Sequence, residues 1–194
     1  MSKVSRFVFA ASAAVALAGS AQAHIEYYFA LLSGPAEAPP NNSPGTGWSL
    51  VTIDLDLATM RVETAFSGLT GTVTAAHIHG PTSTPFAGTA GVMTSTPTFS
   101  GFPSGVSAGT YDRTFDLTIA STYNNSFIAA SGGTISGAMN RLIDAMDQGR
   151  AYFNLHSTTF GGGEIRGFYN VVPSPASAGL LALGGLIASR RRRA

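Results

Sequence analysis

Three histidines have the residue type and the spacing that metal binding requires. His77 and His79 are two residues apart in the segment AHIHGP at 76–81, and His156 ends the segment FNLH at 153–156. Residues two apart in a β-strand point to the same face, so an extended chain presents His77 and His79 together. Two imidazoles at this spacing form half of a Zn²⁺ or Cu²⁺ site. We expect His156 to add a third ligand if the two segments are neighbouring strands.

These histidines also have a purely structural interpretation. A buried imidazole often does no more than hydrogen-bond a backbone carbonyl or a carboxylate, and the pair at 77 and 79 alone favours that role. The third histidine, on an equivalent strand face, strengthens the case for a bound Cu or Zn ion and leaves both interpretations open; no other cofactor is predicted. His24 would chelate copper through its amine and ring only if the chain were cut after Ala23. The sequence has no cysteine, which excludes a thiolate ligand or nucleophile.

The carboxylates offer a weaker case for catalysis. Asp112, Asp116 and Glu164 could serve a hydrolase as acid and base. However, no spacing brings two of them together, and no nucleophile-elbow pattern occurs. The run GGGEIRG at 161–167 permits a tight turn, but no helix follows it to complete an anion site. Glu164 and Arg166 share a strand face, which predicts a local ion pair. We therefore predict that the chain is not an enzyme.

The histidines would have to be positioned by a β-rich domain. Alternating apolar and polar residues, or runs of aromatic and β-branched residues, predict strands at 25–32, 49–57, 61–66, 72–79, 113–119, 150–156 and 164–171. Segment 137–148 has apolar residues at helical spacing, with Gly149 suited to its C-cap. Segment 127–135 leaves strand and helix open. These elements predict an all-β fold, an antiparallel β-sandwich or barrel-like module with one short helix.

The region between the two chain ends is acidic. Six of the eleven basic residues lie before residue 24 or after residue 189, so residues 24–172 keep five arginines, no lysine and all ten acids. The formal charge of this part is therefore −5, although the whole chain carries +1. An acidic surface repels phosphate backbones, so nucleic acid is not expected as a partner. The length suits one domain with its own core.

Residues 1–23 have the order of a secretory signal peptide. Two basic residues precede an uncharged apolar run at 7–17, and the small residues Ala21 and Ala23 mark a cleavage site. The run is shorter than the roughly 20 residues that span a bilayer, which argues against an uncleaved anchor or a buried helix. We expect export through the Sec machinery and removal of this segment by signal peptidase.

Residues 172–194 combine a proline box, an apolar Gly-rich stretch at 178–188 and an arginine cluster. This order resembles the PEP-CTERM sorting signal, whose apolar helix is held transiently in the inner membrane until an exosortase removes it. The resemblance is carried by Val172, Pro173, Pro175, Arg190, Arg191, Arg192 and Arg193. Ser174 stands where that signal has a central Glu. The stretch is short for a permanent span, although a plain C-terminal membrane anchor is the alternative.

The region between the ends resembles the CHRD domain, first described in chordin. The resemblance rests on LSG at 32–34, AHIHGP at 76–81 and FNLHSTTFGGGEIRG at 153–167, and it spans residues 26–170 of a predicted domain at 24–171. It implies a β-sandwich-like module, found in exported bacterial proteins and in animal chordin, without an established enzymatic activity.

The chain ends and the resemblance together predict an exported module with a non-catalytic binding or structural role. Its expected location is the cell envelope, the cell surface or the extracellular matrix, where polysaccharide or surface proteins would be its partners. The alternative function is a metal-binding module that uses His77, His79 and His156 to hold Cu or Zn.

Overall fold

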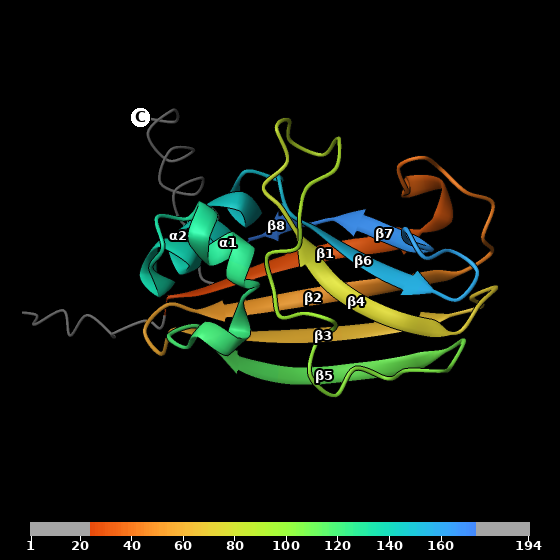
Figure 1. The fold of residues 1–194 in the computed structure, drawn as a ribbon, viewed down its shortest axis with the longest axis horizontal. Helices are drawn as coiled ribbons and strands as arrows, with labels where there is room; N and C mark the ends of the chain where they lie inside the picture. The colour runs from red at the N-terminus through yellow and green to blue at the C-terminus, as the bar shows by residue number, and fades with distance from the viewer. Residues whose placement is uncertain (1–23, 174–194) are drawn as a thin grey trace, which may run out of the picture.

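Eight strands form one antiparallel sheet in the computed structural model, which describes residues 24–173 (Figure 1). The strands are β1 (Ile25–Ser33), β2 (Thr46–Asp54), β3 (Thr59–Ser67), β4 (Val73–His79), β5 (Gly109–Asp116), β6 (Tyr152–Ser157), β7 (Ile165–Phe168) and β8 (Asn170–Val172). The other elements are the helices α1 (Asn125–Ala130) and α2 (Ile135–Asp147) and the 3₁₀ turns η1 (Gly34–Ala36) and η2 (Ala120–Thr122). The predicted predominance of β structure is confirmed.

The sheet is curled into an open half-barrel. Its strands follow the order β4-β6-β7-β1-β2-β3-β5, with β8 paired to β1, so β4 and β5 are the two edges. The strand β1 joins the two halves because it pairs with β2 on one side and with β7 and β8 on the other. Figure 1 shows this continuous layer, with α1 and α2 at one end. Of the two architectures that the sequence left open, the curled sheet is closer to the barrel than to a sandwich of two sheets.

Aromatic side chains from the long loop between β4 and β5 fill the inside of the curled sheet. Phe99 and Phe102 are both buried in the core. The ring centroid of Phe99 lies 5.3 Å from that of Phe115 in β5 and 6.2 Å from that of Phe153 in β6. The loop therefore connects the two ends of the sheet through apolar contacts, which stabilises the curl by burying surface from both sides.

The β2–β3 hairpin confirms the predicted alternation, but β2 ends three residues earlier than expected. The carboxylate of Asp54 accepts hydrogen bonds from the backbone N–H groups of Asp56 and Leu57, at 3.0 and 2.9 Å, and this turns the chain. Leu55 and Leu57, which continue the apolar face of the predicted strand at 49–57, are consequently 41% and 71% exposed. A short-range polar contact thus ends a strand that the apolar pattern would have continued.

The strand predicted at 113–119 is also displaced, since β5 runs from Gly109 to Asp116. The carboxylate of Asp116 accepts a hydrogen bond from the backbone N–H of Thr118 at 2.7 Å and ends the strand. Ile119, the last residue of the predicted strand, lies beyond β5 and is 45% exposed. The final strand pair is β6 with β7, and the predicted strand at 164–171 is divided into β7 and β8.

The helix predicted at 137–148 is α2. The hydroxyl of Thr134 caps it by accepting a hydrogen bond from the N–H of Gly137 at 3.0 Å, and Leu142 and Met146 of its apolar stripe are fully buried. The segment 127–135, for which the sequence left strand and helix open, begins in the shorter helix α1 and does not form a strand. The structure therefore has one α-helix more than the sequence pattern indicated.

The predicted signal peptide at 1–23 and the sorting signal from residue 174 onward lie outside the described residues. Of the sorting signal, Val172 is the last residue of β8 and pairs with Tyr27, and Pro173 follows it. Within residues 24–173, no helix has both the length and the apolar character needed to cross a membrane.

Candidate metal centre

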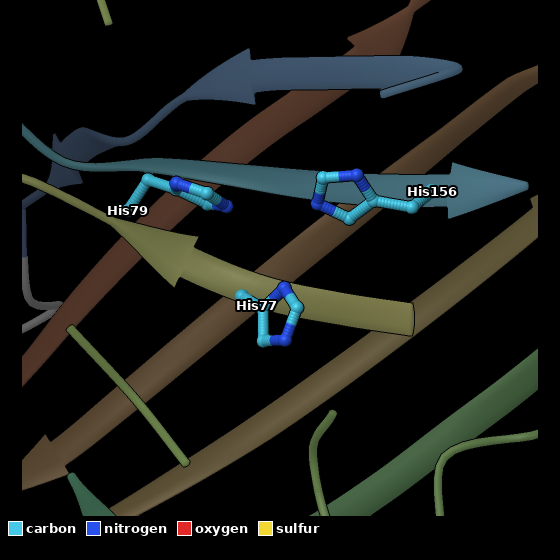
Figure 2. Close-up of side chains that lie close together, drawn as sticks. All are labelled: His77, His79 and His156. Atoms are coloured by element: carbon cyan, nitrogen blue, oxygen red, sulfur yellow. The ribbon is translucent and has the colours of Figure 1, made fainter. Parts of the chain in front are cut away.

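Three imidazoles meet on the face of the sheet where β4 and β6 pair. The register places Ala75 opposite His156 and His77 opposite Asn154, so the three histidines lie on one face of adjacent strands. The ring centroid of His77 lies 5.7 Å from that of His79 and 5.4 Å from that of His156, and the other two centroids are 5.8 Å apart. Figure 2 shows the three side chains close together over β4 and β6. The predicted convergence is confirmed.

The histidine face is covered by protein. Ile78 and Phe153, which alternate with the histidines, are fully buried on the inner face. On the outer face, His77 and His79 are only 6% and 9% exposed, and His156 is partly buried. The covering segments are loops, because the rings of His77 and His79 hydrogen-bond the loop between β4 and β5, and the ring of His156 bonds the loop after β6.

Each imidazole contacts a backbone carbonyl through one ring nitrogen. Nε2 of His77 lies 2.6 Å from the carbonyl oxygen of Pro97, Nδ1 of His79 lies 3.0 Å from that of Ala90, and Nδ1 of His156 lies 3.0 Å from that of Gly161. A carbonyl can only accept, so each of these nitrogens carries the proton and donates it. This contact fixes the ring orientation and leaves the other nitrogen with a free lone pair, as in metal-binding histidines.

The remaining three nitrogens have no hydrogen-bond partner and are shielded from solvent. They are Nδ1 of His77, Nε2 of His79 and Nε2 of His156. One ligand atom from each residue lies within 4.8 Å of the other two. An ion with bonds of about 2.05 Å in a tetrahedral site separates its ligand atoms by about 3.3 Å, so small ring rotations would close the site around an ion.

Burial keeps the three rings neutral. It lowers the pKa of His79 to about 4, against the hydrogen bond to Ala90, which acts in the opposite direction. Burial also lowers the pKa of His77 and that of His156 below their ordinary value. At neutral pH the lone pairs are therefore available for coordination, since an imidazolium cannot bind a metal.

A second group of buried polar residues lies beside the histidines and was not found from the sequence. Asn154 of β6 pairs with His77 of β4 on one side and with Arg166 of β7 on the other. The guanidinium of Arg166 lies 5.0 Å above the ring of Tyr152, and that ring stacks on His79 at 5.0 Å. The signal that could have found these residues is their shared parity with the histidines along β6 and β7.

Arg166 and Glu37 form a buried ion pair that no sequence pattern suggested. Nε of Arg166 is 3.8 Å from Oε2 of Glu37, and the guanidinium also donates to the carbonyl oxygens of Ala36 and Gly88. Burial raises the pKa of Glu37 to about 7, although Arg166 lowers it. Oε1 of this carboxyl group has no hydrogen-bond partner. The contacts join three segments that are distant in sequence.

The predicted ion pair between Glu164 and Arg166 is wrong. The carboxylate of Glu164 instead accepts hydrogen bonds from the hydroxyl of Ser43 at 2.6 Å and from the backbone N–H groups of Thr70 and Gly71 at 2.5 and 3.3 Å. These donors lower its pKa, although burial acts in the opposite direction. The Glu164 carboxylate therefore links the loop that contains Ser43 to the loop at 70–71, while Arg166 pairs with Glu37.

The other candidate residues do not join the cluster. His24 is exposed and bonds Asp56 at 3.1 Å at the start of β1. Asp112 pairs with Arg61 at 2.7 Å on the outer side of β5, and Asp116 ends that strand. No two of the carboxylates proposed for hydrolysis meet. Within residues 24–173, the group of His77, His79 and His156 is the one set of three possible ligands close enough to hold an ion.

Comparison with protein families gives a match to the CHRD domain over residues 28–169. The matched region contains all three clustered histidines and the sheet except the first three residues of β1 and the whole of β8. No curated protein and no solved structure matches the chain.

Proposed function

Because this chain belongs to the CHRD domain family, we propose that it is a non-catalytic binding module whose ligand is a Cu or Zn ion held by His77, His79 and His156. The observation that carries this proposal is the set of three buried ring nitrogens that have lone pairs and no hydrogen-bond partner. Buried polar atoms normally find a partner, so three unpartnered nitrogens on neighbouring rings favour a ligand. The carbonyl contacts of the opposite ring nitrogens add the outer shell that such ligands use.

The covered position of the site favours binding over catalysis. Metal enzymes keep an open coordination position that substrate or water can reach. Here the free nitrogens are shielded from solvent, and two loops hold the rings from outside. An ion in this place would stabilise the fold and the loops above it.

The proposal includes export to the cell envelope, the cell surface or the extracellular matrix. It rests on the sequence patterns at 1–23 and 172–194, which predict processing by signal peptidase after Sec transport and then by an exosortase. Polysaccharide or other surface proteins are the proposed neighbours there. Localising a tagged chain with and without residues 174–194 tests this part. The sorting role is excluded if the two forms localise alike and neither form loses mass through processing at its C-terminal end.

The metal part is tested by the metal content of protein purified from its native compartment. We expect one ion per chain, lost in His77→Ala and kept in the control His24→Ala, since His24 is exposed and outside the cluster. Circular dichroism shows whether each variant is folded, and His156→Gln repeats the test at a less buried position. If metal-stripped, folded protein takes up neither added Cu nor added Zn, the metal function is excluded.

A further inference from the structure

The three ligands of the candidate site bring no negative charge to a bound ion. All are neutral imidazoles, and the part of the chain that the structure describes places no carboxylate or thiolate in the ligand group. The two buried carboxyl groups of residues 24–173 are engaged elsewhere: Glu37 with Arg166, and Glu164 with Ser43 and two backbone N–H groups. An ion that enters the site therefore keeps its full charge.

The surroundings make that charge costly. The ligand nitrogens are shielded from water, and His77 and His79 are more than nine-tenths buried. The guanidinium of Arg166 adds a positive charge nearby, because it lies 5.0 Å above the ring of Tyr152, which in turn stacks on the ring of His79 at 5.0 Å. The solvation energy that an ion loses on burial rises with the square of its charge, so a divalent ion loses about four times as much as a monovalent one.

The number of donor atoms also favours a monovalent ion over a divalent one. Zn²⁺ takes four ligands, and Cu²⁺ prefers a square-planar or tetragonal set. Asn154 pairs with His77 across the strands, but its amide packs against the loop after β6, with the oxygen 2.6 Å and the nitrogen 2.7 Å from the point where a Cβ on Gly163 would stand. Cu(I), a filled-shell ion that is satisfied by two or three nitrogen donors, needs no fourth ligand and no water.

We infer that the ion held by His77, His79 and His156 is monovalent copper, Cu(I), bound by three neutral nitrogens without an anionic ligand. This inference rests on the proposed metal-binding function and specifies its ligand. The oxidation state is inferred from the absence of an anionic ligand and from the exclusion of water from the site. Ligand softness does not decide it, since imidazole binds both copper and zinc.

The test is a competition measurement under anaerobic conditions with protein purified from its native compartment and stripped of metal. Cu(I), Ag(I) as a redox-inert monovalent probe, and Zn(II) are each titrated against chelators of known affinity. We expect one Cu(I) per chain, displaced stoichiometrically by Ag(I), with an affinity at least about 100-fold above that for Zn(II). X-ray absorption of the copper form should show the Cu(I) edge with two or three nitrogen neighbours and no oxygen.

Variants that change the charge of Arg166 test the inference through the preference for Cu(I) over Zn(II), which does not depend on absolute affinities. Arg166→Gln removes the positive charge and should reduce the preference for Cu(I) over Zn(II) about tenfold, whereas Arg166→Lys should preserve it. If Arg166→Gln does not fold, Glu37→Gln at pH 8.5 makes the opposite change and should increase the preference. Equal or tighter binding of Zn(II) overturns the Cu(I) inference and leaves the metal-binding function standing, while absence of any bound ion overturns both.

Discussion

Replacing Glu37 by Gln should remove a pH dependence of stability that this one carboxyl group creates. Burial raises the pKa of Glu37 from 4.5 to about 7 in the folded protein, so the folded state holds a proton that the unfolded state releases. The contribution is therefore fully present below pH 4.5 and is lost as the pH rises through about 7. A difference of 2.5 pKa units corresponds to about 3 kcal/mol of unfolding free energy.

The assay is urea unfolding of metal-stripped protein at several pH values between 5 and 8.5, for the wild type and for Glu37→Gln. The histidines act in the opposite sense, because their lowered pKa values make acid destabilising, and the two proteins share them. The difference between the two free energies therefore isolates Glu37. Gln resembles the protonated carboxyl group, so the variant should match the wild type near pH 5 and exceed it by about 3 kcal/mol at pH 8.5.

Two results would refute this reasoning. A difference that stays constant from pH 5 to 8.5 would mean that Glu37 is ionised throughout and that its pair with Arg166, at 3.8 Å, outweighs burial. A difference of opposite sign, with the wild type gaining stability toward alkaline pH relative to the variant, would mean that the ion pair is net stabilising. Equal urea dependence of both proteins ensures that the comparison concerns stability alone.

Three further predictions follow from single positions. Gly163→Ala should lower the unfolding free energy by roughly 1–3 kcal/mol from backbone strain alone, because φ is +136° there and the new Cβ would stand 2.6 Å from Glu37 and Asn154. The control Gly162→Ala has open space around it and should change the unfolding free energy by less than about 0.5 kcal/mol. Leu142→Ala in α2 should cost about 2–5 kcal/mol by calorimetry or urea unfolding, since the side chain is fully buried. Copper or zinc at 100 times its dissociation constant should raise the unfolding free energy by about 2.7 kcal/mol, and the same addition should leave a folded variant that lacks the site, His77→Ala, unchanged.

The sequence predicts the strands that position the histidines because their side chains alternate. The same two-residue period places His77 with His79 and Asn154 with His156, and one assumption, that β4 and β6 are neighbours, brings the three imidazoles together. That assumption could not be derived. The two strands are separated by the whole of β5, α1 and α2, and their pairing depends on contacts between distant segments.

The contacts that complete the site have no periodic signal. The carbonyl acceptors belong to Pro97, Ala90 and Gly161, in loops where any residue type offers the same backbone oxygen. Glu37 reaches Arg166 across more than a hundred residues of sequence. Local spacing instead suggested Glu164 as the partner of Arg166, and that prediction failed because backbone N–H groups at 70 and 71 bind the Glu164 carboxylate.

A purely structural role explains half of the hydrogen bonding of these histidines and leaves the other half without a partner. If they only supported the loops, one nitrogen of each ring would suffice, and an apolar or smaller residue could occupy the remaining space. A buried polar atom without a partner costs about 1–3 kcal/mol, so three of them cost about 3–9 kcal/mol, a large part of the 5–15 kcal/mol by which domains are stable. Carbonyl groups from two loops orient the rings, and the unpartnered nitrogens lie close to one another rather than beside separate polar groups. The proposed metal ion, which would accept all three lone pairs at once, would remove this cost.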